Sequence, residues 1–201
     1  MRVIMVALVF LVASCLSAKA QDTTISQKRY WLLPDHAKFQ YAGSMGMFSL
    51  GGGYKLFRQR SDLDIYAGLL PKRSGHDNVL IATLKFTHRV WKIDRFPDWE
   101  LVPLTAGFYI TYSFGTEFST DLPDHYPSKY YWWSEAVRPN IFIGSRVSRK
   151  LKRSNTIESI GVYVDLGTNE LKLVSYIQNT DYLAVWDILH AGIGVTMTFK
   201  E

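Results

Sequence analysis

The sequence lacks several features that would decide its class at once. It has one cysteine, Cys15, so no disulfide can form within the chain. No apolar run reaches the length of about 18 residues that a membrane-spanning helix needs, which excludes a helical span. Charged residues make up only 20% of the 201 positions and aromatic residues 14%, which excludes a disordered chain. A single folded domain of ordinary size remains.

The first twenty residues have the pattern of a secretory signal peptide. Arg2 precedes an apolar run over 3–13, and Ala18-Lys19-Ala20 places small residues where signal peptidase reads them. Cleavage after Ala20 removes two basic residues, Arg2 and Lys19, and lowers the formal net charge from +5 to +3. So small a charge does not suggest nucleic acid as a partner. Alternatively, a lipoprotein box at 12–15 would leave Cys15 lipidated.

Alternation with a period of two residues dominates the mature chain. Between Leu80 and Val90, and again between Leu104 and Phe114, mostly apolar side chains occupy every second position, which is typical of β-strands. We predict eight strands, at 39–57, 62–70, 78–92, 101–114, 139–149, 156–167, 170–178 and 189–200. Their lengths suit tilted membrane-spanning strands of about 9 to 11 residues better than the five or six of most soluble strands.

The two faces of these strands differ in chemistry. One face is rich in Ile, Val, Leu and Phe, and the other carries three acids and four bases: Asp64, Lys85, Arg89, Arg146, Asp165, Glu170 and Lys172. In a soluble core each unpaired charge would cost several kcal/mol, whereas in the lumen of a membrane barrel these groups can neutralise one another. Alternation by itself also fits a soluble sandwich or a lipocalin-like barrel with a polar exterior.

The last residues carry the most specific signal. The segment alternates from His190 onward, with Gly194 five positions before Phe199 and only Lys200 and Glu201 beyond. This resembles the terminal strand of outer-membrane β-barrel proteins, and the mature chain as a whole resembles the small eight-stranded members of that family. Members commonly finish on the aromatic residue itself, so the two extra residues are a departure.

The resemblance implies an all-β fold: an eight-stranded antiparallel up-and-down transmembrane barrel with a filled polar lumen and periplasmic termini. It also implies that the barrel assembly machinery recognises the strand ending at Phe199. The expected organisation is a signal peptide at 1–20, a periplasmic segment at 21–38 and the barrel at 39–201.

The predicted loops fit this family in part. A periplasmic N-terminus puts the connections at 58–61, 93–100, 150–155 and 179–188 outside and the longest loop, 115–138, in the periplasm. Barrels of this family usually have short periplasmic turns, so the count of strands is in conflict with the loop lengths. The run Gly51 to Gly53 is either a bulge in one long strand or a turn that divides it, and a turn would shift the count by one.

The long loop is a candidate binding segment. Its positions 126–133 contain five aromatic residues, Tyr126, Tyr130, Tyr131, Trp132 and Trp133. A loop longer than about 15 residues is usually functional or disordered, and so many rings argue against disorder. The rings would form a lid or plug that binds a sugar or an acyl chain, or else an interfacial belt at headgroup depth.

Catalytic residues are weakly indicated. His125, Ser134 and Glu135, or His88 with Ser113, contain the parts of an acyl-transfer set but lack diagnostic spacing, and the His-x-Ser pattern of barrel deacylases is absent. Asp121, Asp124 and His125 bring too few carboxylates for a hard cation. We therefore expect no catalytic role, no metal and no cofactor.

Basic residues cluster near one predicted barrel end. Arg149, Lys150, Lys152 and Arg153, with Arg58 and Arg60, would bind lipopolysaccharide phosphates if that end faces outward, or else form an ordinary solvated surface. We expect a monomeric outer-membrane barrel with a structural or a ligand- or partner-binding role and without a wide pore. The alternatives are a lipid-modifying barrel enzyme, an acyl hydrolase or acyltransferase, and a soluble periplasmic binding barrel.

Overall fold

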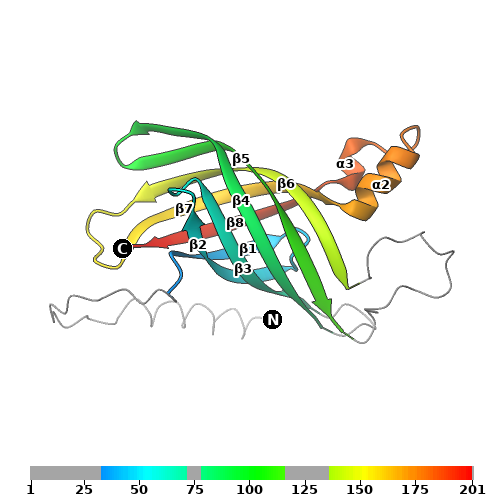
Figure 1. Ribbon diagram of the computed structural model, residues 1–201, viewed down its shortest axis with the longest axis horizontal. Helices are drawn as coiled ribbons and strands as arrows, with labels where there is room; N and C mark the ends of the chain where they lie inside the picture. Colours follow the sequence, from blue (N-terminus) through cyan, green and yellow to red (C-terminus); the bar gives the residue numbers. More distant parts are fainter. Residues whose placement is uncertain (1–32, 72–77, 116–135, 201) are drawn as a thin grey trace, which may run out of the picture. The chain divides into compact units, whose positions relative to one another are not determined.

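The computed structural model describes residues 33–71, 78–115 and 136–200. Within them eight strands pair antiparallel in sequence order, and β8 pairs with β1 to close a barrel (Figure 1). The strands are β1 (His36–Ala42), β2 (Phe48–Leu56), β3 (Ser61–Leu70), β4 (Val79–Phe96), β5 (Trp99–Phe114), β6 (Val137–Lys150), β7 (Ile157–Asn169) and β8 (His190–Phe199). The predicted all-β, eight-stranded antiparallel barrel is confirmed.

The prediction of one long strand over 39–57 is wrong, because this segment forms β1 and β2. The chain reverses over 43–47, where Gly43 and Gly46 have φ values of 82° and 111°, a region that glycine enters without steric cost. The run 51–53 is neither a bulge nor a turn, since it pairs with β1 and β3 in continuous register. Two separated glycines therefore mark the turn, while three consecutive ones lie inside a strand.

The strand predicted at 170–178 is also wrong, because these residues form helix α2 (Glu170–Gln178). The side chain of Asn169 caps the helix by accepting a hydrogen bond from the backbone N–H of Lys172 at 2.9 Å, and Glu170 adds a negative charge to the first turn. A short helix, α3 (Val185–Ile188), follows before β8. No helix among the described residues has the length and apolar character needed to cross a membrane.

The positions of the connections also correct the prediction. The connections at 57–60, 97–98 and 151–156 lie at the barrel end where β1 begins and β8 finishes, which we call the turn end. Helices α2 and α3 lie at the opposite end, the loop end, and β5 finishes and β6 begins there too (Figure 1). The predicted strand count was off by one from β2 to α2, so the connections predicted at 58–61, 93–100 and 150–155 lie at the barrel end opposite to the predicted one. The same holds for the end of β5 and the start of β6, which flank the predicted loop 115–138, while residues 116–135 of that loop lie outside the described residues.

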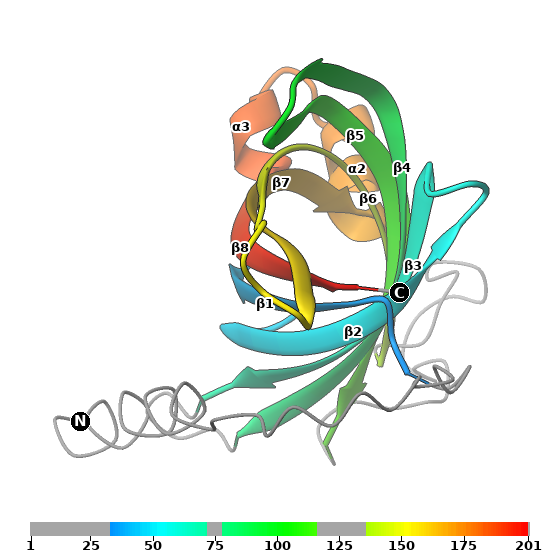
Figure 2. The same ribbon diagram turned by 90° about the vertical axis from the view of Figure 1, so that its left-hand side faces the viewer.

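The interior of the barrel is crowded, and glycines make room for its side chains. Figure 2 shows β1–β8 arranged around one interior. A Cβ atom at Gly53 would lie 2.3 Å from Asp64 Oδ1, and a Cβ at Gly194 would lie 2.3 Å from the Tyr163 ring. In each case the glycine pairs directly with the residue whose side chain fills the space. Glycine at these inward positions lets large polar side chains pack inside a narrow barrel.

Candidate functional site: the charged interior

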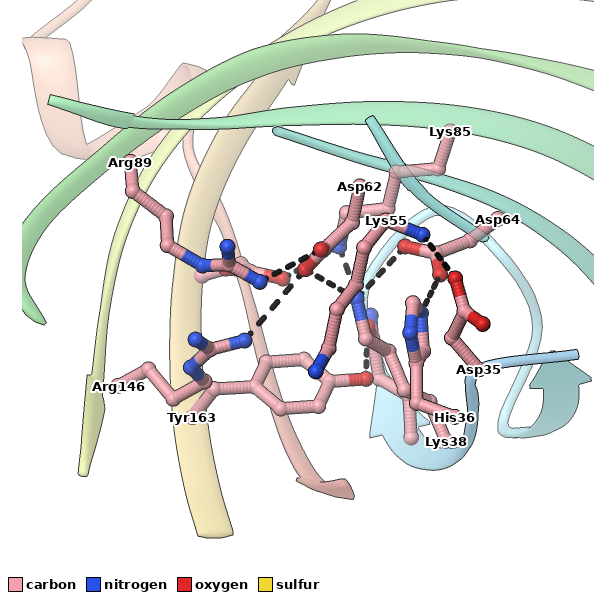
Figure 3. Close-up of polar contacts among 12 residues, drawn as sticks. Asp35, His36, Lys38, Lys55, Asp62, Asp64, Lys85, Arg89, Arg146 and Tyr163 are labelled. Carbon is pink, nitrogen blue, oxygen red and sulfur yellow. Dashed lines mark hydrogen bonds and ion pairs between the residues drawn. The ribbon is translucent and has the colours of Figure 1, made fainter. Parts of the chain in front are cut away.

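The interior holds a network of ionised side chains centred on Asp62. This β3 residue is 1% exposed. Its Oδ1 accepts a hydrogen bond from Arg89 Nη2 at 2.6 Å, and its Oδ2 is 3.3 Å from Lys38 Nζ and 3.4 Å from Arg146 Nη1 (Figure 3). The three cations come from β4, β1 and β6, so one carboxylate ties together strands from different sides of the barrel.

The next inward residue of β3, Asp64, extends this network. Its carboxylate accepts a hydrogen bond from Lys38 Nζ at 2.7 Å and contacts His36 Nε2. Lys38 therefore bridges Asp62 and Asp64, which lie two residues apart and on the same face of the strand. Sharing cations in this way offsets part of the cost of burying each carboxylate.

A second ion pair crosses the interior nearer the loop end. Lys85 on β4 donates to Asp165 Oδ2 on β7 at 2.5 Å. Its ammonium group lies 4.4 Å from the centre of the Phe142 ring, with the rings of Tyr66 and Tyr163 within 6 Å. A buried lysine thus has a carboxylate on one side and aromatic faces around it, both of which stabilise its charge.

Tyrosine and histidine side chains continue the network toward the loop end. The hydroxyl of Tyr163 donates to Gln40 Oε1 at 3.1 Å and lies 3.4 Å from the hydroxyl of Tyr66. Tyr109 OH is 2.6 Å from His190 Nε2, and the ring of His190 is also 3.3 Å from Ser44 Oγ. Hydrogen bonds therefore satisfy most of the polar groups enclosed along the barrel.

At the turn end, acids and bases line the mouth of the barrel. Arg146 Nη2 donates to Glu100 Oε1 at 2.6 Å, and Lys92 Nζ is 3.2 Å from Glu100 Oε2. Lys55 reaches Glu158 at 3.3 Å. Arg146 thus links the buried Asp62 to the partly exposed Glu100.

Five of the seven charged residues predicted to face the interior lie in this network: Asp64, Lys85, Arg89, Arg146 and Asp165. The other two do not, because their segment is a helix rather than a strand. Glu170 pairs with Arg138 at 3.1 Å at the loop end, and Lys172 is exposed on α2. The prediction that these two belong to the interior network is wrong.

Sequence reasoning missed three members of the network. His36 and Lys38 precede the predicted strand start at 39, so their inward positions were not considered. Asp62 was missed although it lies two residues from Asp64, the spacing that puts two strand residues on one face. Extending the period-two pattern back from residue 39 by one position would have found Lys38, and by three positions His36, whereas Asp62 already lay inside the predicted strand 62–70.

The candidate catalytic residues give no assembled site among the described residues. His125, Ser134 and Glu135 lie outside them, as do the aromatic candidates Tyr126, Tyr130, Tyr131, Trp132 and Trp133. His88 is exposed, and Ser113 pairs with Ile81, seven residues from His88 along β4. At ~3.3 Å per residue this separates His88 from Ser113 by about 23 Å, far beyond the reach of a nucleophile and its base.

The basic cluster lies at the turn end. Arg149 and Lys150 finish β6, and Lys152 and Arg153 follow in the connection to β7. The Arg149 guanidinium lies 5.6 Å from the centre of the Trp99 ring, and Lys152 pairs with Asp98 at 2.7 Å. Arg58 and Arg60 lie in the β2–β3 connection at the same end. These residues therefore share the end of the barrel termini, contrary to the prediction.

No group of His, Cys, Asp and Glu side chains suited to a metal ion occurs in residues 33–71, 78–115 and 136–200. The described fold and site define the chain as a closed antiparallel barrel with an ion-paired interior. No family model matches the sequence, and comparisons with curated proteins and with solved structures give no match either.

Proposed function

We propose that the chain is an outer-membrane β-barrel protein, exported and cleaved near Ala20, with a structural or a ligand- or partner-binding role. The observation that carries the proposal is the distribution of side chains on the strands. Each of β1–β8 exposes large apolar side chains, among them Leu50 and Ile65 at 65% and Phe108 at 55%. The positions between them hold the buried charges. A continuous apolar exterior of this extent is typical of a surface that meets lipid.

The composition of the interior separates this proposal from a soluble carrier. A soluble barrel that holds an apolar molecule needs an apolar interior, whereas Lys85, Arg89 and Asp165 are buried here. Water around the barrel would leave its apolar surface exposed on every strand, at about 25 cal/mol for each Å². Hydrocarbon around the barrel removes that cost. Because the sheet is closed, it has no edge strand whose backbone N–H and C=O groups would lie unpaired in lipid.

The lengths of the connections support an orientation with the turn end in the periplasm. The connections at 57–60, 97–98 and 151–156 are short, while 170–189 at the loop end contains two helices. Short periplasmic turns and longer outer loops are usual for such barrels. In this orientation the basic cluster that includes Arg149 and Lys152 faces the periplasm. It would then lie away from the lipopolysaccharide phosphates of the outer leaflet, which the sequence had suggested as its ligands.

We further propose that the barrel forms no wide pore. Ion pairs join β3 to β6 and β4 to β7 across the interior, and others link β3 to β1 and to its neighbour β4. Eight strands enclose a space that side chains can fill. Reconstituted protein is therefore expected to give no large, stable conductance steps in a planar bilayer.

Fractionation and gel mobility test the placement in the membrane. The full chain, produced with its own leader in a Gram-negative host, is expected in the detergent-extracted outer membrane and not in the osmotic-shock fluid. On SDS gels the unboiled protein should migrate faster than the boiled protein, because a closed barrel resists SDS until heated. Release by osmotic shock without detergent would contradict the proposal. Expression without residues 1–20 is the control for export.

A further inference from the structure

We propose that the mouth at the turn end is a binding site for a phosphate group. A cavity of about 40 Å³ lies there among residues of β2, β4, β5, β6 and β7, lined by Lys55, Arg89, Lys92, Arg146 and Lys150 together with Glu100 and Glu158. A water molecule needs roughly 10–15 Å³ of such space, so the cavity has room for about three waters or one small tetrahedral anion. This site would give the proposed ligand-binding role a ligand, and it rests on the proposed membrane orientation only in that the phosphate would reach it from the periplasm.

The charges of the mouth do not balance. Five cations line the cavity, against two described carboxylates, those of Glu100 and Glu158. Both carboxylates are already engaged, since Glu100 pairs with Arg146 and Lys92, and Glu158 pairs with Lys55. Among the described lining side chains, positive charge therefore exceeds negative charge, which suits a phosphate monoester with a charge of about −1.5 to −2 at pH 7.

Two arginines of the mouth are already held in place. Arg89 is 9% exposed and the side chain of Arg146 is 12% exposed. Their guanidinium nitrogens bind Asp62 and Glu100, which fixes the two planes. A phosphate in the cavity can therefore interact with their positive charge at little cost in side-chain entropy.

Lys150 completes the site from its rim. Its side chain lines the cavity and forms no ion pair with any carboxylate whose side chain the structure describes. A phosphate in the cavity would therefore contact the buried Arg89 and the half-buried Arg146 on its inner side and the exposed Lys150 on its outer side. Arginine supplies directional donors and lysine a flexible point charge, a combination suited to phosphate.

Calorimetric titration of the folded full mature chain tests the proposal, in octyl glucoside because this detergent carries no phosphate. The probes are inorganic phosphate, glycerol 3-phosphate and dihexanoyl phosphatidate. We expect saturable binding, weakened about fivefold by Lys150→Gln and tenfold or more by Arg146→Gln. The matched control is Lys152→Gln, which removes a cation at the same end that pairs with Asp98 and does not line the cavity. Its affinity should stay within about twofold of wild type.

Every outcome decides the proposal. Saturable binding of inorganic phosphate, or of inorganic phosphate and glycerol 3-phosphate, supports the proposal. Binding of dihexanoyl phosphatidate alone also supports it and identifies a lipid headgroup as the source of the phosphate. Absence of saturable binding up to about 10 mM, or equal losses for Lys150→Gln and Lys152→Gln, overturns it. If Arg146→Gln fails to fold, the exposed Lys150→Gln still decides. A heat-modifiable membrane protein that ignores phosphate refutes only this inference, whereas a phosphate-binding protein in the osmotic-shock fluid refutes only the membrane placement.

Discussion

Replacing Asp62 by Asn tests whether the interior network holds the barrel together. The substitution keeps the size of the side chain but removes the charge that three cations share at 2.6, 3.3 and 3.4 Å. Because Arg89 and Lys38 are both buried, they would be left near an uncharged amide. Removing one partner of a buried ion pair typically costs 3–5 kcal/mol, so we expect the free energy of unfolding to fall by about 4 kcal/mol.

The matched control is Asp98→Asn at the turn end. Asp98 pairs with Lys152 at 2.7 Å, but the two side chains are 40% and 75% exposed. Exposed pairs contribute about 0–1 kcal/mol, so this chemically identical change should leave stability almost unaltered. Urea unfolding in phospholipid vesicles, followed by tryptophan fluorescence, measures both variants under the same conditions.

A double-mutant cycle identifies the cause of the loss. If Asp62→Asn destabilises the barrel because it leaves a buried cation without a partner, adding Arg89→Gln should restore part of the lost free energy of unfolding, with a coupling energy of about 1–3 kcal/mol. A loss in Asp62→Asn no larger than that in Asp98→Asn would refute the claim that the network stabilises the barrel. Strict additivity of Asp62→Asn and Arg89→Gln would refute the direct role of their 2.6 Å contact.

Two further substitutions test the outer and inner faces. Ile65→Arg places a charge on the outward face of β3 and should lower the free energy of unfolding in vesicles by about 2–4 kcal/mol. Its control, Tyr182→Arg, changes a 91% exposed residue between α2 and α3 and should alter the free energy of unfolding by under about 0.5 kcal/mol. Equally small effects of both substitutions would count against contact of Ile65 with lipid. Gly194→Ala places a Cβ 2.3 Å from the Tyr163 ring and should lower the free energy of unfolding by about 1–3 kcal/mol. At Gly52 the nearest atom would be 3.4 Å from the added Cβ, so Gly52→Ala should be near neutral. Similar midpoint temperatures of heat modifiability for the two variants would argue against tight packing of the interior.

The local pattern of the sequence predicts much of the strand structure. The segments predicted at 78–92 and 101–114 correspond to β4 and β5, since a period of two residues is a property of the strand itself and needs no knowledge of its neighbours. The same period placed Lys85 and Arg89 on the face opposite Leu84 and Val90, and the structure buries the first two residues and exposes the others.

The two wrong segments share a cause. In 170–178 apolar and polar residues are spaced in a way that fits a short strand as well as a helix, and the capping hydrogen bond of Asn169 decides for the helix. In 39–57 the alternation continues across the place where the chain reverses, and the antiparallel pairing of β1 with β2 shows where the first strand ends. The prediction merged β1 and β2 into one strand and counted α2 as a strand, so the predicted number of strands stayed at eight. Each connection between these two segments was therefore predicted at the opposite end of the barrel.

The sequence by itself determined the period of the strands, the apolar character of one face and the presence of charges on the other, because these follow from the order of residues along a single segment. Only the tertiary structure decided that Asp62 meets cations from β1, β4 and β6, that Arg146 also reaches Glu100, and that bases outnumber acids at the turn end. These contacts join strands far apart in the chain, and they depend on the register and closure of the barrel, which no local pattern encodes.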